Sequence, residues 1–343
     1  MSVNTVLVTG GTGFTGGHLC ERLVKEGYHV RALVREPEKA QDLQGWGVEI
    51  VPGDVRDPQS LQAAVQGVDT VYHIAALFRQ GNASRRELWE VNAQGTENML
   101  EAAARAGVRR FIHCSTIGVH GDVKDSPVNE DAPYSPGDEY QETKLEGELI
   151  AQRYVKEGRL PVTIFRPAGI YGPRDLRFLK LVKSIQQGTF AMIGSGKTLF
   201  HPVYIDDLVD GILLCAEKDQ AVGKVYILGG SEIVSLNELV NVIASVLGVR
   251  PPFLRVPFTP VYAVSYLCEL VCAPLGIDPP LYRRRTAFFH KSRAFDISRA
   301  VKELGFKPEV TLREGLECTV QWYEQNGFIR PRNSNSHKEE MLL

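Results

Sequence analysis

Tyr140 and Lys144 are the two residues whose types and spacing most clearly suggest catalysis. The segment 138–155 has a helical pattern, so residues four apart share one face and lie about 6 Å apart along the axis. A free tyrosine, with a pKa of about 10, is a poor base at neutral pH, but a neighbouring ammonium group stabilises the phenolate. Such a pair can exchange a proton with an alcohol or carbonyl oxygen. Of the twelve tyrosines only Tyr140 has a lysine at position i+4, and its place in the chain carries more weight than the spacing.

A glycine-rich loop stands between the first predicted strand, 6–9, and the first predicted helix. It reads Gly10-Gly11-Thr12-Gly13-Phe14-Thr15-Gly16. Gly10, Gly13 and Gly16 permit a tight turn, close approach of a pyrophosphate and close helix packing, while backbone amides from Phe14 and Thr15 onward attract negative charge. Three glycines alone fit an ordinary turn, but between a strand and a helix they predict dinucleotide binding.

The end of the second predicted strand, 30–34, indicates which dinucleotide binds. A carboxylate at this place would hold the ribose 2′-hydroxyl of NAD(H) and repel a 2′-phosphate. The sequence instead has Val34 followed by Arg35, with Lys39 a few residues on. Because the arginine fork suits a phosphate, NADP(H) is favoured over NAD(H). The alternative without a ligand is a solvated basic turn.

Strands and helices alternate through the first half of the chain, which is typical of a parallel sheet covered by helices. We expect an α/β fold, a Rossmann-type doubly wound parallel sheet with a smaller C-terminal substrate-binding lobe. Residues 1–173 form the predicted dinucleotide-binding domain, with segments around 200–230 returning to it, 174–330 form mainly the substrate-binding lobe, and 331–343 form a disordered tail. The predicted strands cover 6–9, 30–34, 48–51, 68–74, 111–115, 162–165, 225–228 and 253–256, and the predicted later helices cover 176–186, 207–216, 236–247 and 312–325.

Composition narrows the range of partners. A net charge of -2 over 343 residues gives no general attraction to nucleic acid, so we expect a small-molecule substrate. The six cysteines show no paired spacing for zinc or redox chemistry, and Cys268 and Cys272 fit an apolar core better than a metal site. No secretory leader precedes the glycine loop, which predicts a cytoplasmic location. Asp57 before Pro58 predicts a helix cap rather than a catalytic acid.

Several motifs together resemble the extended short-chain dehydrogenase/reductase family, which holds sugar-nucleotide epimerases, dihydroflavonol-type reductases and 3β-hydroxysteroid or sterol dehydrogenases. The resemblance covers about residues 3–327. It is carried by Thr9 to Gly16, Gly53-Asp54-Val55, His73-Ile74-Ala75-Ala76, Val91-Asn92 with Gly95-Thr96, Ser115-Thr116, Tyr140 with Lys144, and Arg166-Pro167 through Gly172-Pro173.

The resemblance implies a role for each matching position. Tyr140 is the acid or base toward the substrate oxygen, Thr116 hydrogen-bonds that oxygen, and Lys144 holds the nicotinamide ribose. Asp54 fits the adenine amino group and Val55 the adenine ring, although Asp54 fits a turn equally well. The remaining implied cofactor contacts, each of which plain packing could also explain, are Ile74, Ala75 and Ala76 under the ribose and phosphates, Asn92 bracing the adjoining strand, Ser115 in the nicotinamide pocket, and Pro167 to Ile170 at the carboxamide.

Features of the second half bear on the substrate. Nucleotide-sugar enzymes of this family usually bring an arginine toward the diphosphate, where this chain has Phe200. The apolar run 260–277 contains Glu269 and Pro274 and is short for a membrane span. We expect it to line a lipophilic pocket, with a peripheral membrane contact as the alternative. The arginine triplet at 283–285 fits a solvated surface or a clamp for a phosphate or carboxylate.

We therefore expect an NADP(H)-dependent oxidoreductase that interconverts a secondary alcohol and a ketone on a bulky, lipophilic substrate such as a steroid, sterol or long-chain ketone. The first alternative is a nucleotide-sugar epimerase or dehydratase with tightly bound NAD(P). The second is an idle NADP(H)-sensing protein, against which the retention of Tyr140, Lys144 and Thr116 argues. A homodimer through the helices after Asn82 and Tyr140 is common in the resembling family.

Overall fold

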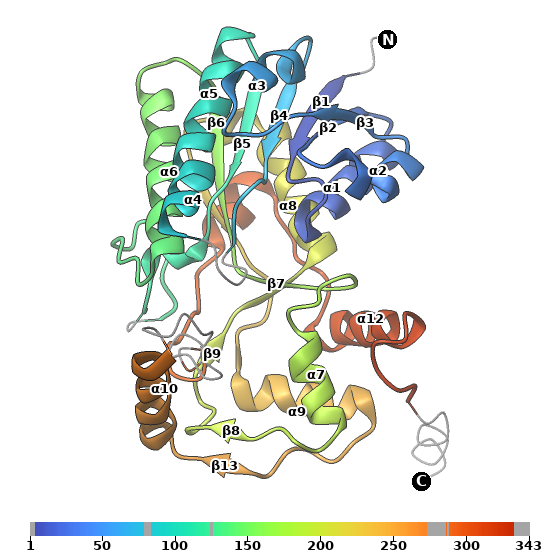
Figure 1. Ribbon diagram of the computed structural model, residues 1–343, viewed down its shortest axis with the longest axis vertical. Helices are drawn as coiled ribbons and strands as arrows, with labels where there is room; N and C mark the ends of the chain where they lie inside the picture. Colours follow the sequence, from blue (N-terminus) through green and yellow to red (C-terminus); the bar gives the residue numbers. More distant parts are fainter. Residues whose placement is uncertain (1–3, 79–83, 124–125, 273–285, 287, 333–343) are drawn as a thin grey trace.

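The computed structural model describes residues 4–78, 84–123, 126–272, 286 and 288–332. Its centre is a seven-stranded parallel sheet with the order β11-β6-β5-β4-β1-β2-β3 (Figure 1). The strands are β1 (Thr5–Thr9), β2 (His29–Val34), β3 (Glu49–Pro52), β4 (Thr70–His73), β5 (Arg110–Cys114), β6 (Val162–Pro167) and β11 (Val225–Leu228). The predicted Rossmann-type sheet is confirmed.

The strand order reverses beside β1, which pairs with β2 on one side and β4 on the other. In a doubly wound sheet such a reversal opens a crevice at the carboxyl ends of the strands, where ligands bind. The glycine loop after β1 and the segments after β4 and β5 all lie at this edge. The fold therefore gathers the predicted site residues from distant parts of the sequence.

Helices cover both faces of the sheet because each strand alternates its apolar side chains. Val6 and Val8 pack with one face, whereas Leu7 between them packs with the other. The first face is covered by α1 (Phe14–Lys25), α2 (Gln41–Gly45) and α8 (Ile205–Glu217), and the second by α3 (Pro58–Val65), α5 (Gly95–Arg105) and α6 (Glu139–Lys156). Asp57 caps α3 by accepting a 3.0 Å hydrogen bond from the Gln59 amide, as predicted.

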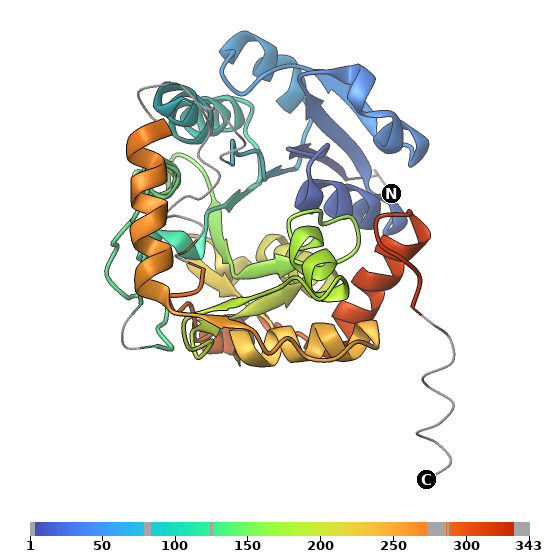
Figure 2. The same ribbon diagram turned by 60° about the horizontal axis from the view of Figure 1, so that its bottom comes forward.

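A smaller lobe lies below the carboxyl edge of the sheet (Figures 1 and 2). It contains α7 (Leu179–Gln186), β8 (Met192–Ile193), β9 (Leu199–Phe200), β12 (Val234–Ser235), α9 (Leu236–Leu247), β13 (Arg255–Val256) and α10 (Phe258–Cys272). The predicted strand 253–256 is shorter than expected, and the helix predicted from residue 176 begins at Leu179. The residue boundaries of the two domains stay a prediction, as does the tail, most of which lies outside the described residues.

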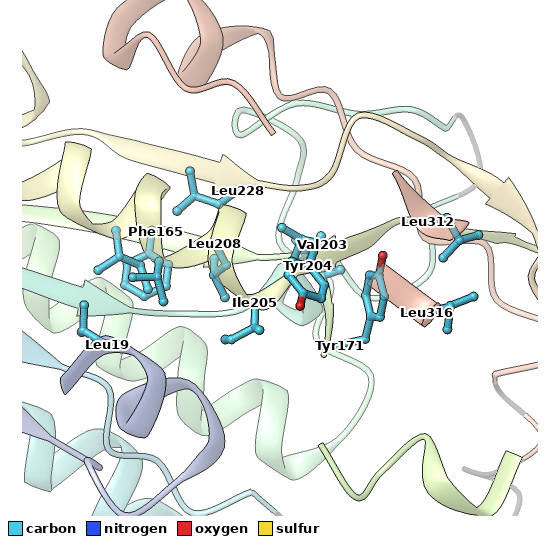
Figure 3. Packing of buried hydrophobic residues seen from close by; sticks show 14 of the residues in the cluster. Leu19, Phe165, Tyr171, Val203, Tyr204, Ile205, Leu208, Leu228, Leu312 and Leu316 are labelled. Atoms are coloured by element: carbon cyan, nitrogen blue, oxygen red, sulfur yellow. The ribbon is translucent and has the colours of Figure 1, made fainter. Parts of the chain in front are cut away.

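The chain passes between the two parts more than once. β7 (Gly169–Tyr171) pairs with β10 (Pro202–Tyr204), after which α8 and β11 return to the sheet. One apolar cluster continues from the sheet to α12 (Leu312–Gln325) through Tyr171 and Tyr204, as Figure 3 shows. This shared core fixes the position of the smaller lobe against the sheet.

α10 differs from the sequence expectation. Ser265 is its single buried residue among those described, and Cys268 and Cys272, expected in a core, are only partly buried. The apolar run does not become a core because the helix lies at the outer margin of the smaller lobe (Figure 2). No helix among the described residues combines the length and apolar character needed to span a bilayer.

Candidate active site

The glycine loop adopts a conformation that larger residues would disturb. Gly10 has φ +76°, and a Cβ atom on it would lie 2.8 Å from the amide nitrogen of Ala75, which follows β4. A Cβ atom on Gly16 would overlap the carbonyl oxygen of Gly10. The two glycines therefore let β1, α1 and the segment after β4 approach closely. Ala75 is held there by a 3.1 Å hydrogen bond from its amide to the Thr9 hydroxyl.

The start of α1 fits a dinucleotide pyrophosphate. Its N-cap residue, Gly13, has no side chain that could bind the amides of the first turn, so those of Phe14 and Thr15 lie at an uncapped helix N-terminus. A cavity of about 180 Å³ adjoins this turn and is lined by Gly13, Phe14 and Lys39 among others. The predicted residues of the glycine loop thus come together at one end of α1.

Arg35 and Lys39 lie beyond the end of β2, as predicted, but in different surroundings. Arg35 is exposed and has no hydrogen bond or ion pair to the rest of the described chain. Lys39, the last residue of a short 3₁₀ turn (Pro37–Lys39), forms a 2.7 Å ion pair with Glu36, the residue that precedes the turn. Arg35 is therefore the more available cation for a phosphate.

Asp54 and Val55 are placed mainly by contacts within the protein. The Asp54 carboxylate accepts a 2.9 Å hydrogen bond from the Arg56 amide and also binds the Arg56 guanidinium. The amide bond forms the turn that the sequence offered as the alternative to an adenine contact. Burial opposes ionisation of Asp54, but the bonds from Arg56 outweigh it and lower its pKa. Val55 is 6% exposed and packs close to Gly95 of α5. Contacts of these two residues with adenine stay a prediction.

The predicted catalytic residues meet where β5 ends beside the first turns of α6. Lys144 is buried, its Nζ donates a 2.5 Å hydrogen bond to the carbonyl oxygen of Cys114, and burial lowers its pKa. Two residues beyond Cys114, the Thr116 hydroxyl accepts a 3.0 Å bond from the Gly118 amide. The ring of Tyr140 packs edge-on against Phe78, with ring centroids 5.0 Å apart. One lysine, one tyrosine and one hydroxyl thus border the same end of the sheet.

Asn92 connects the loop after β4 to the catalytic helix. Its side-chain oxygen accepts a 2.7 Å bond from the amide of Leu77, directly after Ala76, and its Nδ2 donates 3.0 Å to the hydroxyl of Thr143. A Cβ atom on Gly147 would lie 2.5 Å from the Asn92 carbonyl oxygen, so this glycine lets α6 pack closely. Asn92 therefore positions Ile74 to Ala76 relative to Tyr140 and Lys144.

Ser115 is placed by a buried carboxylate, and its predicted place in the nicotinamide pocket stays a prediction. It is 2% exposed, and its hydroxyl donates a 2.5 Å bond to Glu148. Glu148 is fully buried and also forms an ion pair with Arg166 at 2.5 Å and 3.0 Å. Ser115 therefore faces this buried ion pair.

Arg166 extends this buried network through contacts that the sequence did not predict. Its guanidinium donates to Nε2 of His120 at 2.8 Å, to the carbonyl of Glu130 at 2.9 Å and to the hydroxyl of Tyr134 at 3.0 Å. The network ties the ends of β5 and β6 to α6. The spacing of Tyr140, Lys144 and Glu148, each four residues apart, was the available signal.

An apolar wall borders Pro167 to Ile170, the segment predicted to contact the carboxamide. A Cβ atom on Gly169 would overlap the ring of Phe200, which packs directly on this glycine. The Phe200 ring also contacts Phe178 and Phe288, with centroids 6.0 Å and 5.9 Å apart. The place predicted for an arginine in nucleotide-sugar enzymes is therefore part of an aromatic cluster.

Comparisons with known proteins agree with this arrangement. Residues 6–229 match the model of the NAD dependent epimerase/dehydratase family. The chain is 32% identical to sterol demethylase protein B of Methylococcus capsulatus, over 95% of this chain and 100% of that one. It is 30% identical to 3beta-hydroxysteroid-dehydrogenase/decarboxylase isoform 1 of Arabidopsis thaliana, over 98% of this chain and 82% of the relative. The crystal structure of UDP-glucuronic acid 4-epimerase from Bacillus cereus in complex with NAD is similar with a TM-score of 0.76 and 27% identity, over 94% of this chain and 99% of that one.

Proposed function

This chain belongs to the NAD dependent epimerase/dehydratase family and is an enzyme of the extended short-chain dehydrogenase/reductase type, and from that premise we propose that it interconverts a secondary alcohol and a ketone on a bulky, lipophilic substrate, with NADP(H) as its preferred cofactor. The class of substrate extends to steroids, sterols and long-chain ketones.

The aromatic cluster of Phe178, Phe200 and Phe288 carries the proposal. It stands beside Gly169, in the segment predicted to hold the carboxamide, so a substrate next to the nicotinamide meets rings rather than a cation. Aromatic side chains bury large apolar areas, and burial of apolar area favours a hydrophobic substrate. The names of two relatives, a sterol demethylase protein and a 3beta-hydroxysteroid dehydrogenase/decarboxylase, support the same class.

In this proposal the bound nicotinamide supplies or accepts a hydride. During reduction Tyr140 donates a proton to the carbonyl oxygen of the substrate, and Thr116 orients that oxygen by a hydrogen bond. The ammonium group of Lys144 stabilises the resulting phenolate and holds the nicotinamide ribose. Oxidation of the alcohol uses the same groups in reverse.

The cofactor preference rests on Arg35. Its guanidinium is exposed at the end of β2 and has no ion pair to the rest of the described chain, whereas Lys39 is paired with Glu36. A 2′-phosphate would give Arg35 a partner that matches its forked donors. We also propose a cytoplasmic location, because all six cysteines are free thiols, as a reducing compartment would leave them.

The test is a titration of the purified enzyme with NADPH and NADH, followed by nicotinamide fluorescence. We expect at least about tenfold tighter binding of NADPH, lost in Arg35→Ala and kept in Arg31→Ala, whose side chain is paired with Glu49 at 2.8 Å. Equal binding of both cofactors would overturn the NADP(H) preference. Turnover is then measured with steroid and long-chain ketones and with UDP-sugars. Conversion of a UDP-sugar without reduction of any ketone would replace this proposal by the epimerase alternative.

A further inference from the structure

α10 presents an apolar surface to the solvent. Six of its large side chains are 41–60% exposed, namely Tyr262, Val264, Tyr266, Leu267, Leu270 and Val271. At 100° per residue they cover an arc of about 200°, and among the described residues of α10 this arc holds no charged side chain. Glu269 lies outside the arc and is half-buried. We name these six residues the α10 arc. A surface helix of a soluble protein ordinarily carries polar residues on its outer face, so the arc indicates a site of interaction.

Exposed apolar side chains also precede the helix, in a segment that is rich in basic residues. Phe253 is 92% exposed and Leu254 is 53% exposed, and both directly precede β13. Among the described residues from 250 to 293, four are basic and one is acidic, although the whole chain has a net charge of -2. The basic residues are Arg250, Arg255, Lys291 and Arg293, and the acidic residue is Glu269. An apolar helix accompanied by basic residues has the chemistry that binds anionic lipid headgroups.

Aromatic contacts connect this helix to the proposed substrate site. Phe258, the first residue of α10, stacks on Tyr262 of the α10 arc and on His290, with centroids 5.6 Å and 4.6 Å apart. The next residue back in the sequence, Phe289, contacts Phe288 at 5.3 Å, and Phe288 contacts Phe200 at 5.9 Å. A lipophilic molecule held at the α10 arc would therefore lie at one end of a row of aromatic side chains whose other end is Phe200.

We propose that the α10 arc docks the enzyme on an anionic membrane surface, from which its lipophilic substrate enters the site. The substrate part of this inference rests on the proposed function. Tyr262 and Tyr266 lie at one border of the arc, where an amphipathic ring suits the boundary between headgroups and acyl chains. Membrane docking is peripheral, because α10 has 15 residues and a span needs about 20.

A second copy of the chain is a poorer occupant. Among the described residues, the exposed apolar side chains of this surface are eight, namely the six of the α10 arc with Phe253 and Leu254, whereas a stable interface uses about 20–30 residues on each side. Pairing two copies through this face would also bring together two segments whose described residues have a net positive charge. A lipid surface has neither difficulty, because it is continuous and negatively charged.

The test is flotation of the full chain with vesicles of phosphatidylcholine alone or with about 30% phosphatidylglycerol, which gives the vesicles a clearly negative surface. We expect binding to the anionic vesicles, weakened by high salt, and at least about a tenfold loss in the double variant Leu267→Glu, Leu270→Glu. Both side chains are more than half exposed, so the melting temperature should not change. The matched control is Val301→Glu, an exposed apolar residue (43%) outside the arc, which should bind like the wild type.

Failure of the wild-type enzyme to float, or equal flotation of the double variant, would overturn membrane docking. Analytical sedimentation of the same proteins tests whether a second copy binds the arc instead. If the wild type is a dimer that the double variant abolishes, and neither protein binds vesicles, the arc is a contact between copies and the proposal is wrong. Reduction of a short water-soluble ketone should be unchanged in the double variant. If no ketone is reduced at all, the proposed function fails, whereas the flotation result still decides the role of the arc.

Discussion

Replacing Arg166 by methionine should lower the free energy of unfolding by about 3–5 kcal/mol. The side chains of Arg166 and Glu148 are 1% and 0% exposed, and two short contacts join them. Methionine has a similar reach but leaves the Glu148 carboxylate buried without its cation. Removal of one partner from a buried ion pair ordinarily costs this much because the remaining charge is not solvated.

The loss is measured by urea denaturation followed by circular dichroism, with Arg86→Met as the control. Arg86 and Glu90 form an ion pair of 2.6 Å, yet the arginine side chain is 87% exposed, so we expect no measurable loss of stability. Similar small losses of stability in both variants would refute the argument that burial makes the ion pair of Arg166 important for stability. Adding Glu148→Leu to Arg166→Met removes the stranded charge, so the double variant should recover part of the lost stability.

Three further predictions concern the loop, the acid-base residue and pH. Gly16→Ala should abolish NADPH binding, because the added methyl group would overlap the Gly10 carbonyl. The control Gly45→Ala, which has open space around the added methyl group, should bind NADPH normally. Fluorescence titration measures both variants, and intact binding by Gly16→Ala would show that the loop can shift to accept a side chain. Tyr140→Phe should lower kcat by about 10²–10⁴-fold with little change in the Kd for NADPH, and a nearly normal kcat would remove Tyr140 from proton transfer. Burial lowers the pKa of His73 to about 3, so the unfolded chain takes up a proton near pH 6.5 while the folded chain does not. The contribution of His73 to the free energy of unfolding should be complete above pH 6.5 and should fall between pH 6.5 and 3, by at most about 1.4 kcal/mol per pH unit. Urea titrations at several pH values measure this change, and a rise in stability on acidification would contradict the prediction.

The fold was predictable where the sequence pattern of a segment is sufficient to identify it as a strand or a helix. The alternation of β-branched strands and helices predicted the parallel sheet, and the helices 236–247 and 312–325 have the predicted limits. The short strands of the smaller lobe were harder. β9 has two residues, and its antiparallel partner β12 lies more than thirty residues on, so no local pattern marks it.

The site was predictable where one motif gathers the residues. The glycine loop and the pair of Tyr140 and Lys144 each lie within a few residues of sequence. The environments of Ser115 and Asn92 depend on Glu148 and Leu77, whose contacts form only after the strands and α6 have packed. The core burial expected for Cys268 and Cys272 of α10 was wrong for a related reason, since an apolar run has the same pattern whether it packs in a core or lies exposed.

The late return of the chain to the sheet limits how such enzymes can be recombined. β11 completes the sheet beside β6 only after the chain has built part of the smaller lobe. A chain cut after residue 173 would leave β6 as an unpaired edge and uncover the face that α8 protects. Transplanting a substrate lobe from a relative therefore needs several junctions that leave 202–228 in place. In this architecture new specificity is more easily acquired by replacing segments within a continuing scaffold than by joining ready-made modules.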